Sequence, residues 1–313
     1  MDTNTMKKLS FIFTSLALLV CSTALFAGIA DPQTYIKSRD FTVVNSIGIP
    51  ASVGWVEVQN LGVEFPPHNA SSTTNRHKPL SNFYGAQEPA WHDVTFVVHA
   101  KKGDEIEELF ESFSKGDNIR GSISVNIMNP KETYQTIASF ELQELTLIRF
   151  SKGLVADVEH PSTLKFSFTV SPGYVKISTF KDNINSKTIN SVSKLVSALQ
   201  MPKMKSFSYS GIEMQKNDTT IAGDQYGTDT CHVDNYGTIS MEFKLELDSV
   251  DWINIVRNQY EGSIGGAKPN GGFEVSGGLS WHVESFNFPT FNSKSDAQLI
   301  QYVTIRIEKF IKK

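Results

Sequence analysis

Residue types that often do chemistry are few in this chain, and they are scattered. No two histidines have the i,i+4 spacing that places two zinc ligands on one face of a helix, and no cysteine pair completes a zinc finger. We therefore predict no metal site, no catalytic residues and no cofactor-binding site. The histidines are His68, His77, His92, His99, His160, His232 and His282.

The nearest approach to a nucleophile and base is the run Cys231-His232-Val233-Asp234, with His92-Asp93 as a weaker pair. A cysteine and its histidine must meet in space, whereas neighbours on one strand point to opposite faces of the sheet. We expect Cys231 to be a buried or loop thiol, in keeping with the usual behaviour of a free cysteine. An enzyme is not predicted.

Two glycine-rich segments invite a ligand-binding interpretation. Acidic residues between Gly223 and Asp229 suggest a calcium loop, but the regular carboxylates of an EF-hand are missing, and Gly/Asp clusters mostly mark turns. The segment Gly262–Gly278 precedes an expected strand, whereas a phosphate site needs a helix N-terminus. We expect this segment and the polar loop Pro66–Asn82 to be long hairpin or interface loops.

Composition narrows the class of protein. The 313 residues include 29 Lys and Arg against 33 Asp and Glu, and 40% are hydrophobic, which is too apolar for a disordered chain. A formal net charge of -4, without a long run of one sign, argues against binding to nucleic acid. The length is that of roughly two domains.

The first 30 residues are typical of a secretory signal peptide. Lys7 and Lys8 precede an uncharged, largely apolar run that ends in small residues. We expect cleavage before Asp31, and cleavage after Ala27 is the second choice. The protein is then exported to the periplasm, the cell surface or the medium.

Two other interpretations of this segment stay open. An apolar run of about 20 residues can also anchor a chain in a membrane, and Cys21 follows a leucine-containing stretch similar to a lipidation site. Cleavage would leave Cys231 as the single cysteine, so the mature chain could form no internal disulfide. It would have to rely on its core or on assembly.

Alternating and β-branched or aromatic runs dominate the rest of the chain. In Thr163–Val170, for example, apolar residues occupy every second position, as on a sheet with one solvated face. The expected strands are Ser52–Val58, Val94–Ala100, Ser122–Met128, Ala138–Arg149, Thr163–Val170, Ser206–Glu213, Thr238–Leu247, Phe273–Phe288 and Gln301–Phe310.

Three stretches have helical periodicity: Asp104–Phe113, Asp248–Tyr260 and, more weakly, Ser186–Gln200. The last lies within residues 181–205, which are rich in Lys, Asn and Ser and are expected to be a partly helical linker. The sequence thus predicts a mainly β protein. Two small β-barrel or sandwich domains, 31–180 and 206–313, would each carry one short helix.

The expected elements follow the same order on both sides of the linker. A first strand, a long polar loop, a second strand, a short helix after an acidic residue and the final strands occur in each half. This order predicts an internal tandem duplication, whose period of roughly 110–150 residues is too long for a solenoid repeat.

This order of elements resembles the contractile-tail tube family, which includes phage tail tube proteins and the Hcp tube protein of type VI secretion systems. The residues that carry the resemblance are Gly62-Val63-Glu64 and Gly211-Ile212-Glu213 on the first strands, Glu108–Phe113 and Val250–Ile253 on the helices, and Phe140–Arg149 and Trp281–Phe288 on the late strands. The resemblance implies small β-barrels, each capped by its helix, and oligomerisation.

The function expected on these grounds is structural. The chain would assemble with itself, or with other envelope or secretion-complex proteins, into a ring, tube or envelope-associated complex. No nucleic acid is expected as a partner, and the membrane would be met only through the export signal. The alternative is an exported monomeric β-sandwich that recognises glycan or a cell surface through aromatics such as Trp91, Tyr226 and Trp281.

Overall fold

The computed structural model describes residues 35–45, 55–65, 89–101, 105–131, 135–155, 163–179, 204–217, 230–246, 251–264 and 279–310. Residues from Ile36 onward form one compact unit. Strands dominate the described residues, and one α-helix lies in each half: α2 (Ile106–Ser114) and α4 (Asp251–Ile264). The predicted mainly β fold is confirmed, and both helices lie within three residues of the expected bounds, except that α4 ends four residues later.

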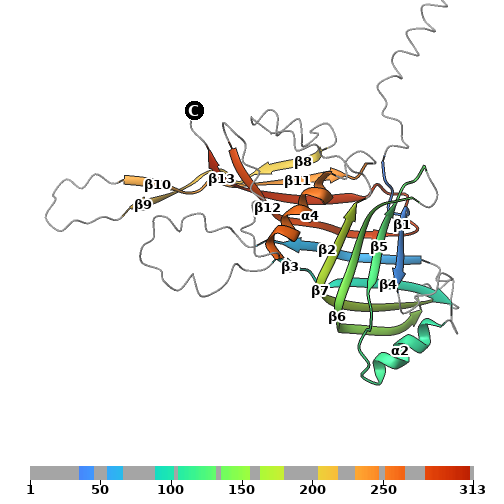
Figure 1. Cartoon of the computed structure of the whole chain (residues 1–313). Coiled ribbons are helices and arrows are strands. Elements are labelled where there is room, and N and C mark those ends of the chain that lie inside the picture. The colour runs from blue at the N-terminus through green and yellow to red at the C-terminus, as the bar shows by residue number, and fades with distance from the viewer. Residues whose placement is uncertain are drawn as a thin grey trace, which may run out of the picture. The chain divides into compact units, whose positions relative to one another are not determined.

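One large antiparallel sheet organises the molecule (Figure 1). Its strands follow the order β1-β5-β6-β7-β4-β2-β12-β13-β11-β8, and the short β3 (Ala90–Trp91) pairs beside β2. The strand bounds are β1 Phe41–Asn45, β2 Trp55–Glu64, β4 Val94–Lys101, β5 Ile123–Met128, β6 Thr136–Val155, β7 Thr163–Thr179, β8 Met204–Tyr209, β11 Thr238–Lys244, β12 Leu279–Asn292 and β13 Ile300–Phe310.

The two halves repeat one pairing pattern. The first set of four strands is β6-β7-β4-β2 and the second set is β12-β13-β11-β8, with every neighbouring pair antiparallel. A helix follows the equivalent strand in each set, α2 after β4 and α4 after β11. In the first half, β5 and β1 extend the sheet further. The matching order is what the predicted duplication requires, whereas the domain bounds at 180 and 206 stay a prediction.

The two sets are joined edge to edge by β2 and β12. Their antiparallel register runs from Glu64 opposite Ser285 to Glu57 opposite Asn292. The strands approach so closely at Gly62 that a Cβ there would lie 2.5 Å from Cβ of Asn287 and 2.8 Å from the carbonyl oxygen of Phe286. Glycine is therefore required where the halves meet.

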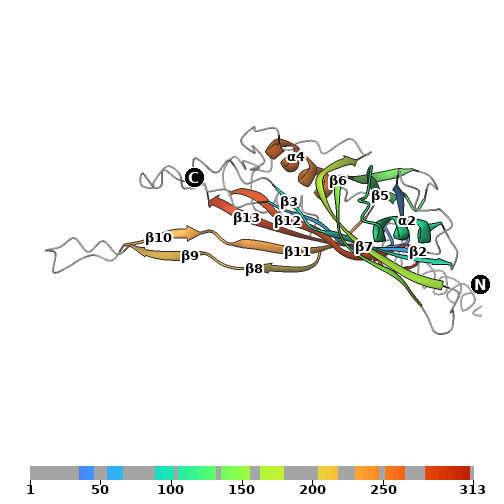
Figure 2. The same ribbon diagram turned by 90° about the horizontal axis from the view of Figure 1, so that it is seen from below.

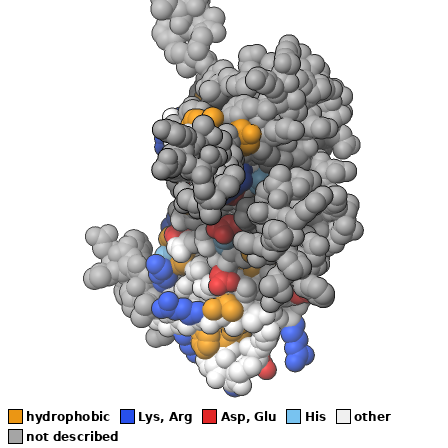
Figure 3. Space-filling model, turned by 90° about the vertical axis from the view of Figure 1, so that its left-hand side faces the viewer, with side chains coloured by type: hydrophobic (Ala, Val, Ile, Leu, Met, Phe, Trp, Pro, Cys, Tyr) orange, Lys and Arg blue, Asp and Glu red, His pale blue; other side chains and the backbone are white. Residues whose placement is uncertain are grey.

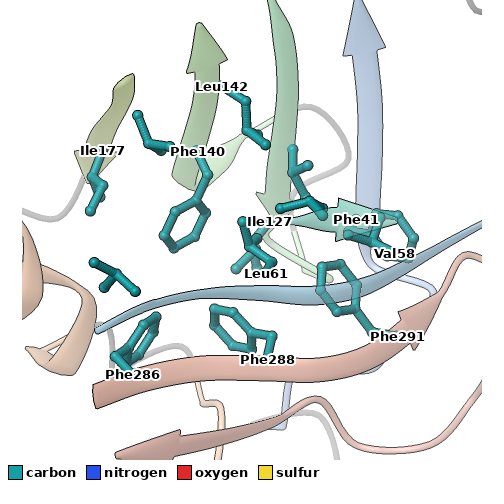
Figure 4. Packing of buried hydrophobic residues seen from close by; sticks show 14 of the residues in the cluster. Phe41, Val58, Leu61, Ile127, Phe140, Leu142, Ile177, Phe286, Phe288 and Phe291 are labelled. Carbon is teal, nitrogen blue, oxygen red and sulfur yellow. The ribbon is translucent and has the colours of Figure 1, made fainter. Parts of the chain in front are cut away.

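The sheet curls around its apolar face. Ile36 donates its N–H to the carbonyl of Leu245 and accepts a bond from the N–H of Leu299, while β1 of the same segment pairs with β5. The first segment thus connects β5 of the first half with the residues that adjoin β11 and β13 in the second half. Figure 4 shows the side chains that meet inside it: Phe41, Val58, Leu61, Ile127, Phe140, Leu142, Ile177, Phe286, Phe288 and Phe291.

The long β6–β7 hairpin bends where Glu144 lies opposite Gly173, between the pairs Gln143–Tyr174 and Leu145–Pro172. Glu144 has a φ of 52°, and a Cβ on Gly173 would lie 2.9 Å from its carboxylate. A left-handed residue and a glycine together allow the two strands to change direction. The part of the hairpin beyond the bend carries the surface on which α2 packs.

The helices are anchored in different ways. Phe110 of α2 is fully buried among aromatic rings of the β6–β7 hairpin, with a centroid separation of 4.9 Å to Phe166. In α4, the side-chain amide of Gln259 accepts the N–H of Val283 at 2.9 Å and donates to its carbonyl at 2.7 Å. This amide satisfies the backbone of β12 where the register with β13 shifts. An apolar cluster thus holds α2, and a polar clamp contributes to holding α4.

Beyond β8 and β11 the chain continues as a second hairpin, β9 (Glu213–Asn217) and β10 (Thr230–Asn235). In Figures 1 and 2 this hairpin extends the line of β8 and β11 away from the other strands. Gly211 and Gly237 face each other at the joint, both with positive φ (89° and 92°). A Cβ on Gly237 would collide with the carbonyl of Gly211, so glycine sets the joint. We call β8, β9 and residues 210–212 between them the arm strand.

Several expectations can be compared with these elements. The predicted strand Ser206–Glu213 covers most of β8 and the glycine joint but reaches only the first residue of β9, and β1, β3 and β10 were not expected. The predicted third helix, Ser186–Gln200, lies outside the described residues. In the part of the chain that the structure describes, no helix is long and apolar enough to cross a membrane.

Candidate functional site

The chemistry-bearing residues do not converge. Among the described residues, no three or more His, Cys, Asp or Glu side chains gather in a way that could hold a metal ion. Cys231 and His232 are consecutive residues of β10. The glycine-rich segment 223–229 and most of the segment 262–278 lie outside the described residues, as does the polar loop 66–82.

His99 on β4 is the most perturbed titratable group of the described residues. Its ring stacks on Trp55 of β2 with centroids 3.5 Å apart, and the Lys294 ammonium lies 5.6 Å from the Trp55 ring. The pKa of His99 is lowered from 6.5 to about 4, mainly by burial, with Lys165 and Lys294 also lowering it and Glu57 opposing them. The imidazole is therefore neutral at pH 7 and acts as a packing group.

His92 lies beside the seam between β2 and β12. Its backbone N–H donates to the carbonyl of Gly62 at 2.9 Å, and its Nε2 lies 3.3 Å from Oε1 of Glu64. The Glu64 side chain is largely exposed, so this contact is a surface pair. Together with Gly62 it secures the short strand β3 against β2, and we assign it a structural role.

The aromatic residues considered for a binding face have different positions. Trp281 is fully buried and lies in the core against Trp252 of α4, with centroids 6.1 Å apart. Trp91 is partly buried and packs edge-on against Tyr260 at 5.4 Å. Tyr226 lies outside the described residues. The interpretation of Trp281 as a ligand-contacting residue is therefore wrong, because its ring serves the core.

What the fold does present is a sheet with two ends. Within the described residues β1 pairs only with β5, and β8 only with β11, so each has one edge without a partner strand. Unpaired edges are templates for further pairing, and monomeric proteins blunt them with charges, prolines or bulges. β1 (FTVVN) has none of these residues. In β8 (MKSFSY) the one charge is Lys205.

Lys205 is paired within the sheet, so it opposes the approach of another strand less than an unpaired charge would. Its ammonium donates a hydrogen bond of 2.6 Å to the carboxylate of Glu242, on the paired strand β11. The hydrogen bond lowers the pKa of Glu242 and raises the pKa of Lys205. The charge is thus directed back over the sheet, and the outer edge of β8 keeps an almost neutral strand.

Exposed apolar side chains gather near these ends. Figure 3 looks from the side toward which β9 and β10 extend in Figure 1, and hydrophobic side chains appear on its described surface among charged ones. On the arm strand Ile212 is 50% exposed and Met214 57%, while Val44 of β1 is 52% exposed. The exposed large apolar residues of the described chain are Val44, Ile148, Tyr209, Ile212, Met214 and Tyr302.

Sequence reasoning expected strand edges to matter but did not find these two. β1 is a run of five residues with two adjacent valines, and so short a run gives a weak signal on its own. The break at Gly211 was hidden because Gly211-Ile212-Glu213 was aligned with Gly62-Val63-Glu64. Gly62 does lie on its strand as expected, whereas Gly211 lies between two strands.

Comparison with known proteins adds little. No family model matches the chain, and no curated protein matches it. A solved structure, the cryo-EM anti-feeding prophage (AFP) baseplate, six-fold symmetrised, contains a chain that matches with a TM-score of 0.23 and 9% identity. The match covers 45% of this chain and 92% of that chain. A likeness this weak bears on neither fold nor function.

Proposed function

We propose that the protein is a non-enzymatic structural subunit that assembles with copies of itself, or with other envelope or secretion-complex proteins, into a ring, tube or envelope-associated complex. The observation that carries the proposal is the pair of end strands that, among the described residues, have one unpaired edge each, with Val44 exposed on β1 and Tyr209, Ile212 and Met214 exposed on the arm strand. Buried backbone pairing at such edges gives affinity without requiring any catalytic group.

The proposal includes export. The basic start, the apolar run and the small residues of the first 30 positions support passage through a membrane with loss of this segment. N-terminal sequencing of the protein recovered from outside the cytoplasm should give Asp31 or Gly28. Recovery of a soluble cytoplasmic chain that still begins at Met1 would refute this part of the proposal.

Assembly is tested on the mature chain, residues 31–313. Light-scattering mass across a range of concentrations should give a species several times the mass of one chain, and negative-stain images should show rings or tubes. Deletion of 262–278 examines the loop expected at the interface. A monomer at high concentration that also contacts no copy of itself in its native complex would leave the exported binding module as the better proposal.

A further inference from the structure

The pairing of β2 with β12 inside the chain is an example of the contact that the outer edge of β8 could make with another strand. β2 is the last strand of the first set, and its outer edge is occupied by β12, the first strand of the second set. β8 holds the equivalent last place in the second set. One outer edge is thus covered by the neighbouring set, and the other is free among the described residues.

The covered strand β2 contains Gly62, and the joint that follows β8 contains Gly211; the surroundings of these two glycines differ. At Gly62 the partner strand is so close that a Cβ would strike the backbone of β12. At Gly211 a Cβ would meet no atom within 4 Å. The joint at Gly211 is therefore uncrowded, β8 has no strand on its outer edge among the described residues, and the arm strand adds the exposed side chains of Ile212 and Met214.

The opposite end of the sheet supplies a suitable strand. β1 extends the first set through β5, and its exposed residues Thr42 and Val44 alternate with Phe41, which is buried in the core. Its five residues are close in number to the six of β8, and β1 carries no charge that Lys205, Glu213 or Lys216 of the arm strand would repel. A second copy of the chain thus offers an edge that fits this one.

We infer that the arm strand of one copy pairs with the β1 edge of a second copy, so that the sheet continues from chain to chain as it continues from β2 to β12 within the chain. This inference rests on the proposed function and names its contact. Because the two surfaces are different, the contact is head-to-tail, and repetition gives a closed ring or an open filament.

Charged substitutions at exposed positions test the contact without touching the core. Val44→Asp alters the β1 edge, and the double variant Ile212→Asp/Met214→Asp alters the arm strand; Asp disfavours strand pairing and would be desolvated at the contact. Ile148→Asp is the matched control, since Ile148 is equally exposed at 54% but lies on β6, an inner strand of the sheet. Circular dichroism and urea midpoints confirm that each variant is folded.

Analytical ultracentrifugation then gives a pattern specific to a head-to-tail contact. Each edge variant alone should sediment as a monomer, with association weakened at least 100-fold, while the Ile148→Asp control assembles like the unaltered chain. An equimolar mixture of the two edge variants should form a dimer and stop there, because each partner retains one intact edge.

The other outcomes distinguish failure of the arm-to-β1 contact from failure of assembly itself. If the unaltered chain assembles and the edge variants assemble equally well, or the mixture gives no dimer, the arm-to-β1 contact is wrong while the proposed function stands. If the unaltered chain is monomeric under all conditions, the proposed function fails first and this contact with it.

Discussion

β2 and β8 hold the same place in the two sets of four strands, yet β2 has a partner strand on both edges and β8 has one among the described residues. β2 is covered on its outer edge by β12 and runs unbroken through Gly62. β8 ends at Tyr209, and at Gly211, with a φ of 89°, the arm strand passes from the large sheet into the β9–β10 hairpin. β2 is thus paired on both sides and tolerates a left-handed residue at Asn60 (φ 64°), whereas β8 has one partner strand among the described residues and ends before the glycine joint.

The helices show a second difference between the halves. α2 rests on the aromatic surface of the β6–β7 hairpin, whereas α4 holds β12 through the polar clamp of Gln259 on Val283. The hydroxyl of Tyr260 also accepts a hydrogen bond of 3.4 Å from the N–H of Val175 on β7. Since β7 belongs to the first set and β12 to the second, α4 contributes to binding the two sets together.

The largest effect on stability is expected at the apolar helix. Phe110→Ala removes a fully buried ring from contacts with Phe166, Phe168, Phe113 and Phe150, and should cost about 3–5 kcal/mol of unfolding free energy. Urea denaturation measures it. Glu108→Ala on the exposed side of the same helix is the control, with a change within about 0.5 kcal/mol. Equal effects of the two substitutions would mean that α2 does not hold the first half.

The sequence predicted the elements whose patterns depend on neighbouring residues, and it did not predict pairings between residues far apart in the chain. The alternation in Thr163–Val170 and the helical period of Asp104–Phe113 arise from neighbouring residues, and both elements are present. The pairing of Gly62 with Asn287 joins positions far apart in the chain, and no local pattern specifies it. The same holds for the bend at Glu144, where a partner strand imposes a left-handed conformation on a residue that rarely adopts it.

For the candidate site, the sequence indicated assembly through edges and loops, but which side chains of an edge strand are exposed could not be read from it. Val44 and Val43 are adjacent valines with equal apolar character, and only the structure shows that Val43 packs on the core and Val44 faces outward. Trp281 shows the opposite error, because an aromatic residue proposed for a surface lies within the core. Which face of a strand is buried depends on the whole sheet.

The second prediction compares the cost in stability of placing alanine at Gly62 and at Gly211. Gly62→Ala forces a methyl group against the backbone of β12 and should cost about 3 kcal/mol by overpacking the seam. Gly211→Ala meets no atom but keeps a positive φ, so it should cost only about 1–2 kcal/mol. Urea midpoints of the two variants give the difference. If Gly211→Ala proved the more damaging, the close approach of β2 and β12 would not be what holds the halves together.

The third prediction concerns the polar clamp. Gln259→Leu keeps the volume of the side chain but leaves the buried N–H and carbonyl of Val283 without their side-chain partner, at a cost of about 2–4 kcal/mol. Hydrogen exchange of the Val283 amide should also quicken more than that of Val170 on β7, which serves as the internal reference. Unchanged protection at Val283 would show that the clamp adds nothing to the join between the sets.

The last prediction is an acid sensitivity that belongs to the first set. The pKa of His99 is about 4 in the folded protein and 6.5 when exposed, so between these values the unfolded chain binds a proton that the folded chain refuses. Stability is therefore complete above pH 6.5 and declines as the pH falls toward 4, by about 2–3 kcal/mol from this group at pH 4.5.

His99→Phe retains an aromatic ring on Trp55 and cannot take up the proton. Urea unfolding of both proteins at pH 7 and pH 4.5 isolates the His99 contribution, because the other carboxylates and imidazoles are common to both. The unaltered protein should lose more stability than the variant by this amount. An equal loss in the two proteins would mean that His99 titrates normally, and that the stack on Trp55 does not exclude water from the ring.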